Sequence, residues 1–178
     1  MKTATENLEN DHVHILRLTE IMEHATYDSE PDVANLEEIV DIIRNFADGL
    51  HHAKEENIFF PMLSQRGFSS TQGPVAVMLN EHVAGRNYVK GMADNISLYK
   101  KGDAGALEKV YANMRGYAEL LRSHISKENN VLFRMADRAL TQADQEKLLE
   151  GFREAESSGL PAAEYVNKIE NLAVLYEI

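Results

Sequence analysis

The residues that could do chemistry occur in a motif that appears twice. Residues 51–60 read His-His-Ala-Lys-Glu-Glu-Asn-Ile-Phe-Phe, and residues 124–133 read His-Ile-Ser-Lys-Glu-Asn-Asn-Val-Leu-Phe. Each copy has a histidine followed four residues later by a glutamate, and such residues share one face of a helix. An imidazole nitrogen and a carboxylate oxygen together suit a divalent transition metal. Each copy is therefore one half of a candidate metal site.

A second, weaker repeat supplies one more histidine to each half. Asn10-Asp11-His12-Val13 matches Asn80-Glu81-His82-Val83 at an offset of 70 residues, and the two His-x-x-x-Glu motifs are 73 residues apart. The chain thus consists of two similar helical hairpins, in which an early position on one helix lies level with a late position on the next. Six side chains are expected to meet: His12, His51, Glu55, His82, His124 and Glu128. Such ligands suit iron, manganese, cobalt or zinc rather than calcium or magnesium.

Neighbouring residues compete with some of these assignments. A single His-x-x-x-Glu pair is more typical of a solvated surface pair, and only the repetition favours metal binding. The alignment of the two copies selects His51 and Glu55 over His52 and Glu56. The match to His82 likewise selects His12 over His14. We therefore predict contacts with the ligand side chains, rather than with metal, for a set of four residues: His52, Glu56, Tyr117 and His14. For His52 and His14 a position facing solvent stays open. Tyr117 is most simply a core aromatic, with metal contact as the alternative.

These residues lie on segments that show helical periodicity. Apolar spacing predicts helices over residues 5–27, 31–66, 74–99, 104–138, 141–159 and 161–176. Pro31 is expected to open the second helix, and Pro61 to kink or end it. We predict an all-α fold, an up-down-up-down four-helix bundle with two additional C-terminal helices. Residues 1–138 form the metal-binding bundle in this prediction, and residues 139–178 a helical extension packed on it.

Composition excludes several classes of protein. The 178 residues carry a net charge of −11, which argues against binding to nucleic acid or to anionic membranes. The absence of cysteine excludes thiolate zinc sites, iron–sulfur ligation and disulfides. Residues 1–7 do not resemble a signal peptide, and no apolar run is long enough to span a membrane. We therefore expect a cytoplasmic protein.

At these motifs the chain resembles the hemerythrin-like superfamily, in its branch named for His-His-Glu cation-binding motifs. The resemblance covers residues 8–138, and its strongest element is His-His-Ala-Lys-Glu-Glu at residues 51–56 followed by Phe60-Pro61. It implies a four-helix bundle around an oxo- or hydroxo-bridged centre of two iron ions, with zinc or manganese as possible substitutes. Met78 lies four residues before His82, where oxygen-carrying relatives have another histidine. That departure argues against reversible oxygen carriage.

The resemblance leaves three functions open. The first is a non-heme di-iron binding protein that engages dioxygen, peroxide or nitric oxide, or that handles or senses iron. The second is a di-iron enzyme with peroxidase-like, catalase-like or nitric-oxide-reducing activity. The third is a helical interaction module with a structural metal. The sequence does not identify a protein partner or decide whether the protein is an enzyme.

Overall fold

The structure, a computed structural model, describes residues 3–157 and 161–178, and these residues form helices without any strand. The all-helical prediction is thereby confirmed. The predicted end of the helix over residues 141–159 lies outside the described residues. Along the chain the elements are α1 (Ala4–Ala25), α2 (Val33–Ile42), η1 (Ile43–His52), η2 (Glu55–Phe59), α3 (Phe60–Gln65), α4 (Gly73–Lys100), α5 (Ala106–Lys127), η3 (Glu128–Leu132), α6 (Phe133–Ala139), α7 (Gln142–Ser157) and α8 (Ala162–Leu175).

Local hydrogen bonds explain where several helices begin and end. The Thr141 backbone N–H donates to Asp144 Oδ2 at 2.8 Å, and the Asp144 N–H donates to Thr141 Oγ1 at 3.3 Å, which makes a capping box before α7. Gly67 follows α3 with a φ of 93°, a conformation that favours glycine. Helix α2 is capped by Asp32, whose carboxylate accepts from Ala34 N–H at 2.8 Å. Pro31 therefore precedes the cap and does not open the helix.

Wide π-helical turns interrupt the second and fourth long segments, which the sequence predicts as continuous α-helix. The turns η2 and η3 begin at the two motif glutamates, Glu55 and Glu128, whose carbonyls accept from N–H groups five residues later. Pro61 follows only η2, so proline is not required for the wide turn. The longer η1 contains Gly49, where a Cβ atom would lie 2.9 Å from the Arg44 carbonyl oxygen. π-Helical turns are rare in proteins, and those that do occur often lie at functional sites.

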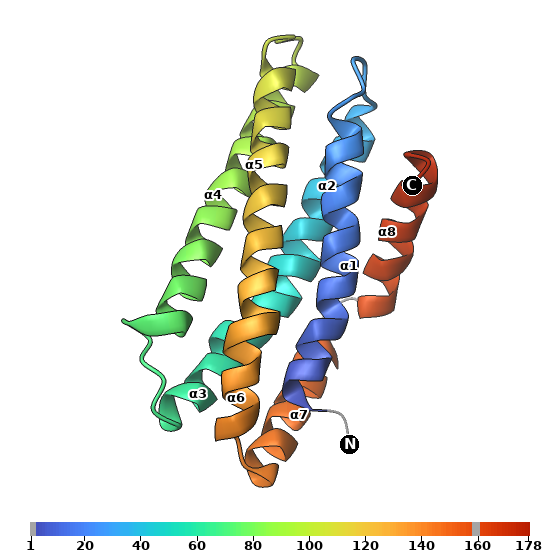
Figure 1. Ribbon diagram of the computed structural model, residues 1–178. Coiled ribbons are helices and arrows are strands. Elements are labelled where there is room, and N and C mark those ends of the chain that lie inside the picture. The colour runs from blue at the N-terminus through green and yellow to red at the C-terminus, as the bar shows by residue number, and fades with distance from the viewer. Residues whose placement is uncertain (1–2, 158–160) are drawn as a thin grey trace.

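The helices pack around two apolar clusters with a polar layer between them. Figure 1 shows α5 beside α4 on one side and beside α1 on the other. On each long segment the apolar residues that precede the motif and those that follow it belong to different clusters, as for Leu8 and Ile15 on either side of His12 on α1. The motif residues therefore occupy the level at which the two clusters meet.

The C-terminal helices lie against this core. Helix α7 contacts α1 and η2, and α8 contacts α1 and α2. The division into a bundle at residues 1–138 and an extension at residues 139–178 stays a prediction. Among the described residues, no helix is both long enough and apolar enough to cross a membrane.

Candidate metal centre

The six predicted side chains come together from both hairpins. Nε2 of His12 lies 3.1 Å from Nε2 of His51, and Nε2 of His82 lies 3.2 Å from Nε2 of His124. We call these pairs, with the groups that surround each, the 12/51 half and the 82/124 half. Two nitrogens at right angles on a metal about 2.1 Å from each would be about 3.0 Å apart. The spacing within each pair is therefore that of neighbouring metal ligands.

Each glutamate faces both halves. Oε1 of Glu55 lies 3.7 Å from His51 Nε2, and Oε2 of the same side chain lies 3.3 Å from His82 Nε2. Glu128 Oε2 lies 3.3 Å from both His12 Nε2 and His124 Nε2. Both carboxylates are thus placed to be shared between the two halves.

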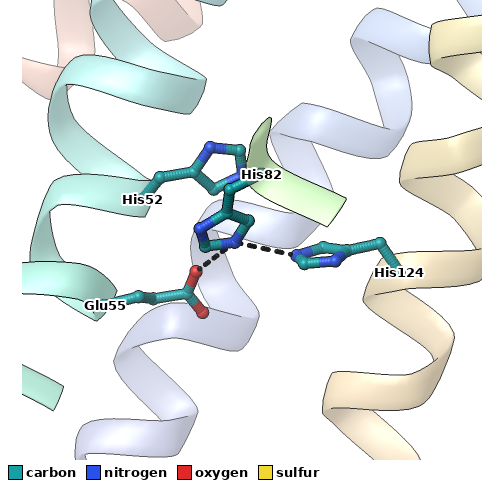
Figure 2. A group of neighbouring side chains, drawn as sticks. All are labelled: His52, Glu55, His82 and His124. Atoms are coloured by element: carbon teal, nitrogen blue, oxygen red, sulfur yellow. Dashed lines mark hydrogen bonds and ion pairs between the residues drawn. The ribbon is translucent and has the colours of Figure 1, made fainter. Parts of the chain in front are cut away.

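His52 joins the 82/124 half. Figure 2 shows its ring beside those of His82 and His124, above Glu55. The rings of His52 and His82 are stacked with centroids 3.9 Å apart, and His52 is only 4% exposed, so the solvent-facing alternative for this residue is wrong. Two groups offer ligand atoms within 4.8 Å of one another: His52, Glu55, His82 and His124; and His12, His51, Glu55 and Glu128.

The surroundings of the four carboxylate oxygens of Glu55 and Glu128 show whether a metal ion suits this site. All four are buried and accept no hydrogen bond. A buried carboxylate without a partner is costly, because it has lost its hydration. Imidazole nitrogens surround these oxygens, and metal cations are the partners that this mixed donor set suits. The residues present therefore fit a transition metal in each half.

Hydrogen bonds on the far side of each ring aim Nε2 inward. His12 Nδ1 pairs with Asn129 Oδ1 at 2.7 Å and His51 Nδ1 with Asp11 Oδ2 at 3.1 Å. In the other half the Nδ1 atoms pair with carboxylate oxygens of Glu56 for His82, of Glu81 for His124 and of Asp48 for His52. Such partners fix the tautomer of metal-ligating histidines.

Electrostatic coupling shifts the protonation of these groups in the metal-free protein. Burial favours the neutral ring of His82, but the Glu55 carboxylate 3.3 Å from its Nε2 and the hydrogen bond to Glu56 outweigh that effect and raise its pKa to about 9. Burial and the neighbouring His82 lower the pKa of His52 to about 3. Burial opposes ionisation of Glu128, yet His124 and His12 lower its pKa to about 2. In the metal-free protein at neutral pH Glu128 is therefore ionised, and a proton on His82 occupies the place of a cation.

Two of these hydrogen-bond partners share a position in the sequence, directly before a motif histidine. Asp11 and Glu81, each one residue before a motif histidine, bind the histidine of the neighbouring helix rather than their own neighbour. Glu56, which was predicted to contact the ligand side chains, lies with its Oε1 2.7 Å from Nδ1 of His82. Asn129 lies within the second copy of the motif, at the position that corresponds to Glu56, whereas Asp48 lies outside both copies. His14 is partly exposed, is 6.3 Å from Phe46 between ring centroids, and belongs to neither ligand group. Tyr117 is buried, as a core aromatic should be.

Comparison with known proteins agrees with this geometry. The family described as Hemerythrin HHE cation binding domain matches residues 3–136. The chain is 40% identical over 87 residues to the iron-sulfur cluster repair protein YtfE of Enterobacter sp. (strain 638), a match that covers 47% of this chain and 39% of that protein. It is 29% identical over 100 residues to the iron-sulfur cluster repair protein DnrN of Neisseria gonorrhoeae, covering 54% of this chain and 64% of that protein. The matches thus span well under half of the first relative and less than two thirds of the second. No solved structure matches the chain.

Proposed function

We propose, from the premise that the chain belongs to the Hemerythrin HHE cation binding domain family, that it is a non-heme protein with two iron ions. In this proposal the four long helical segments form an up-down-up-down bundle that holds both ions at its centre. His12 and His51 would hold one ion, and His52, His82 and His124 the other. Glu55 and Glu128 would be shared between them.

The observation that carries the proposal is the set of four buried carboxylate oxygens without hydrogen-bond partners. A hydrophobic core tolerates an ionised glutamate only when a counter-charge lies beside it. In this protein each carboxylate faces one imidazole of either half, so two shared cations would compensate both glutamates at once.

Iron in this environment supplies one-electron chemistry toward small oxidants. The protein residues would orient the ligands and exclude bulk water from the centre. Histidines and two glutamates give fewer protein ligands than two six-coordinate ions can accept. The remaining positions would accept dioxygen, peroxide or nitric oxide, and we propose that engaging such a molecule is the function of the centre.

The test is iron loading under anaerobic conditions followed by elemental analysis. We expect close to two irons per chain in the wild-type protein and in His24→Gln, which changes an exposed histidine outside the centre. Glu55→Gln preserves the side-chain size but removes the shared charge, and should reduce iron content in both halves. A wild-type protein that retains only zinc, or no metal after iron supplementation, contradicts the proposal.

A second candidate function, the handling of iron for damaged clusters, is favoured by the printed names of the two relatives. We would then expect an iron-free acceptor protein to take up iron faster from the iron-loaded protein than from free ferrous iron in solution. A third possibility, an enzyme that consumes peroxide or nitric oxide, is distinguished from these two functions by measuring catalytic turnover of peroxide or nitric oxide. Equal rates for the iron-loaded wild type and Glu55→Ala would exclude the enzyme.

A further inference from the structure

A cavity opens beside His52 on the side of the 82/124 half. Residues of η1, α4 and α5 line it, among them Asp48, His52, Val89 and Tyr117, and its volume is about 140 Å³. A water molecule takes about 30 Å³ in the liquid, so this space accepts a ligand of a few heavy atoms. It is smaller than the pockets of about 300–1,000 Å³ that hold larger organic ligands.

A hydrogen-bond donor without a partner lines this cavity. The Tyr117 side chain is 1% exposed and lines the cavity, and no described residue accepts a hydrogen bond from its hydroxyl. Burial raises the pKa of Tyr117 well above its ordinary value, so the hydroxyl keeps its proton. A ligand in the cavity would supply the missing acceptor.

The charges around the cavity favour an anion. Arg44, Arg86 and Lys90 line it together with a single carboxylate, Asp48, although the whole chain carries a net charge of −11. Arg86 is held by Asp48 and Glu56, each at 2.8 Å, and Lys90 pairs with Asp94. Arg44 is exposed and forms no ion pair with any described residue. One guanidinium is therefore available to an incoming anion.

The internal repeat shows that this cavity belongs to one half only. At the offsets of 70 and 73 residues, the counterparts of Arg86, Asp48 and His52 are Leu16, Leu121 and Ile125. Leu121 and Ile125 are buried in the apolar core, and Leu16 packs against it. The 12/51 half thus has hydrophobic packing where the 82/124 half has a polar cavity.

We propose that this cavity binds a small inorganic monoanion of two or three heavy atoms and leads it to the 82/124 half, with Tyr117 as hydrogen-bond donor and Arg44 at the mouth. The proposal rests on the proposed function, because the cavity serves the metal centre. Azide is a suitable probe, since it has the stated size and charge and its binding to iron is visible in the optical spectrum.

The experiment measures azide binding to iron-loaded protein by optical titration and stopped flow, with iron content determined for every variant. Val89→Phe fills the cavity and should slow azide association at least tenfold, whereas Val89→Ala widens it and should leave association equal or faster. Tyr117→Phe should raise the dissociation constant about tenfold, the effect of one hydrogen bond to a charged group. Its control is Tyr111→Phe on the same helix, whose hydroxyl already donates to the Asp28 carbonyl at 2.7 Å. Tyr111→Phe should bind azide as the wild type does.

Arg44→Gln should weaken azide binding several-fold at low salt, with Lys101→Gln as an exposed control. Wild-type affinity in Arg44→Gln, with loss in Val89→Phe, would overturn the anion preference. Normal iron content with wild-type azide kinetics in both Val89→Phe and Tyr117→Phe would overturn the cavity as the route and leave the metal centre intact. Absence of iron from the wild-type protein would overturn the proposed function and this inference together. If Val89→Phe fails to fold, Tyr117→Phe and its control still decide the matter.

Discussion

The two halves of the centre share one framework but differ in the groups around it. In both, a histidine from one long helix meets a histidine from the next, and the same two glutamates face them. The 12/51 half has two imidazoles, backed by one carboxylate and one amide. The 82/124 half has three imidazoles, each backed by a carboxylate. A repeated sequence has thus produced two unequal groups of candidate metal ligands.

The motif lysines differ in the same way. Lys54 is fully buried and lies 2.6 Å from Asp11 and 3.0 Å from Glu156, so it connects the support of His51 to α7. Its counterpart Lys127 is 39% exposed and pairs with Glu81, the support of His124. The 12/51 half is thus connected to α7 through a buried lysine, whereas the 82/124 half is supported by a more exposed lysine and has a cavity beside it.

The largest effect expected from this difference is on stability. Lys54→Met leaves Asp11 and Glu156 without their cation and should lower the free energy of unfolding by about 3–5 kcal/mol, as for a broken buried ion pair. Lys127→Met removes a more exposed pair and should cost about 1 kcal/mol or less. Chemical denaturation of both variants measures the contrast. Equal losses would show that burial of Lys54 has no energetic consequence.

The next effect is on the order of metal binding. His52→Ile copies the residue found at the matching position 125 and removes one imidazole from the 82/124 half. In the wild type we expect the first ion to bind this half, and the substitution should weaken that first step by about a hundredfold. Calorimetric titration with ferrous iron or cobalt resolves the two steps. The matched control is Ile125→Val, which should leave both steps unchanged.

Acidity should distinguish the halves as well. His82 must lose its proton to ligate, and its pKa of about 9 in the metal-free protein lies above the usual value. Protons therefore compete with metal below pH 9, and affinity for the first ion should fall about tenfold from pH 8 to pH 7. The metal-free protein should lose the stability that this raised pKa contributes as pH rises from about 6.5 to 9. Metal affinity that is constant over pH 7–9 would contradict the assignment of His82.

The smallest effect concerns Glu56. Glu56→Gln keeps a hydrogen bond to His82 but makes the support neutral, as Asn129 is for His12. We expect a weakening of the first binding step by about fivefold, below the 10–100-fold typical when such a partner is lost altogether. Asn129→Asp is the reciprocal change and should strengthen the second step. The same calorimetric titration measures both variants. Unchanged binding in Glu56→Gln and in Asn129→Asp would show that the carboxylate partners do not cause the difference in metal affinity between the two halves.

Local patterns in the sequence account for much of what the structure contains. Helical periodicity predicts the helices to within a few residues, and the repeat selects the six side chains that the structure brings together. Metal ligation by those six residues, the bundle topology and the cytoplasmic location stay predictions. The wide turns at Glu55 and Glu128 could not be predicted, because nothing in their composition separates them from an ordinary α-helical turn.

Spacing and repetition in the sequence predict the six side chains of the candidate centre, because i,i+4 spacing is a local property of a helix and the repeat marks which spacings matter. Which partner supports which ring depends instead on how the helices pack against one another. Asp11 binds His51 rather than adjacent His12, and Glu56 binds His82 on another helix. These contacts depend on the relative register of neighbouring helices, and the spacing of residues along one helix does not specify that register. The same register turns His52 inward and leaves a cavity beside one half of a repeated site.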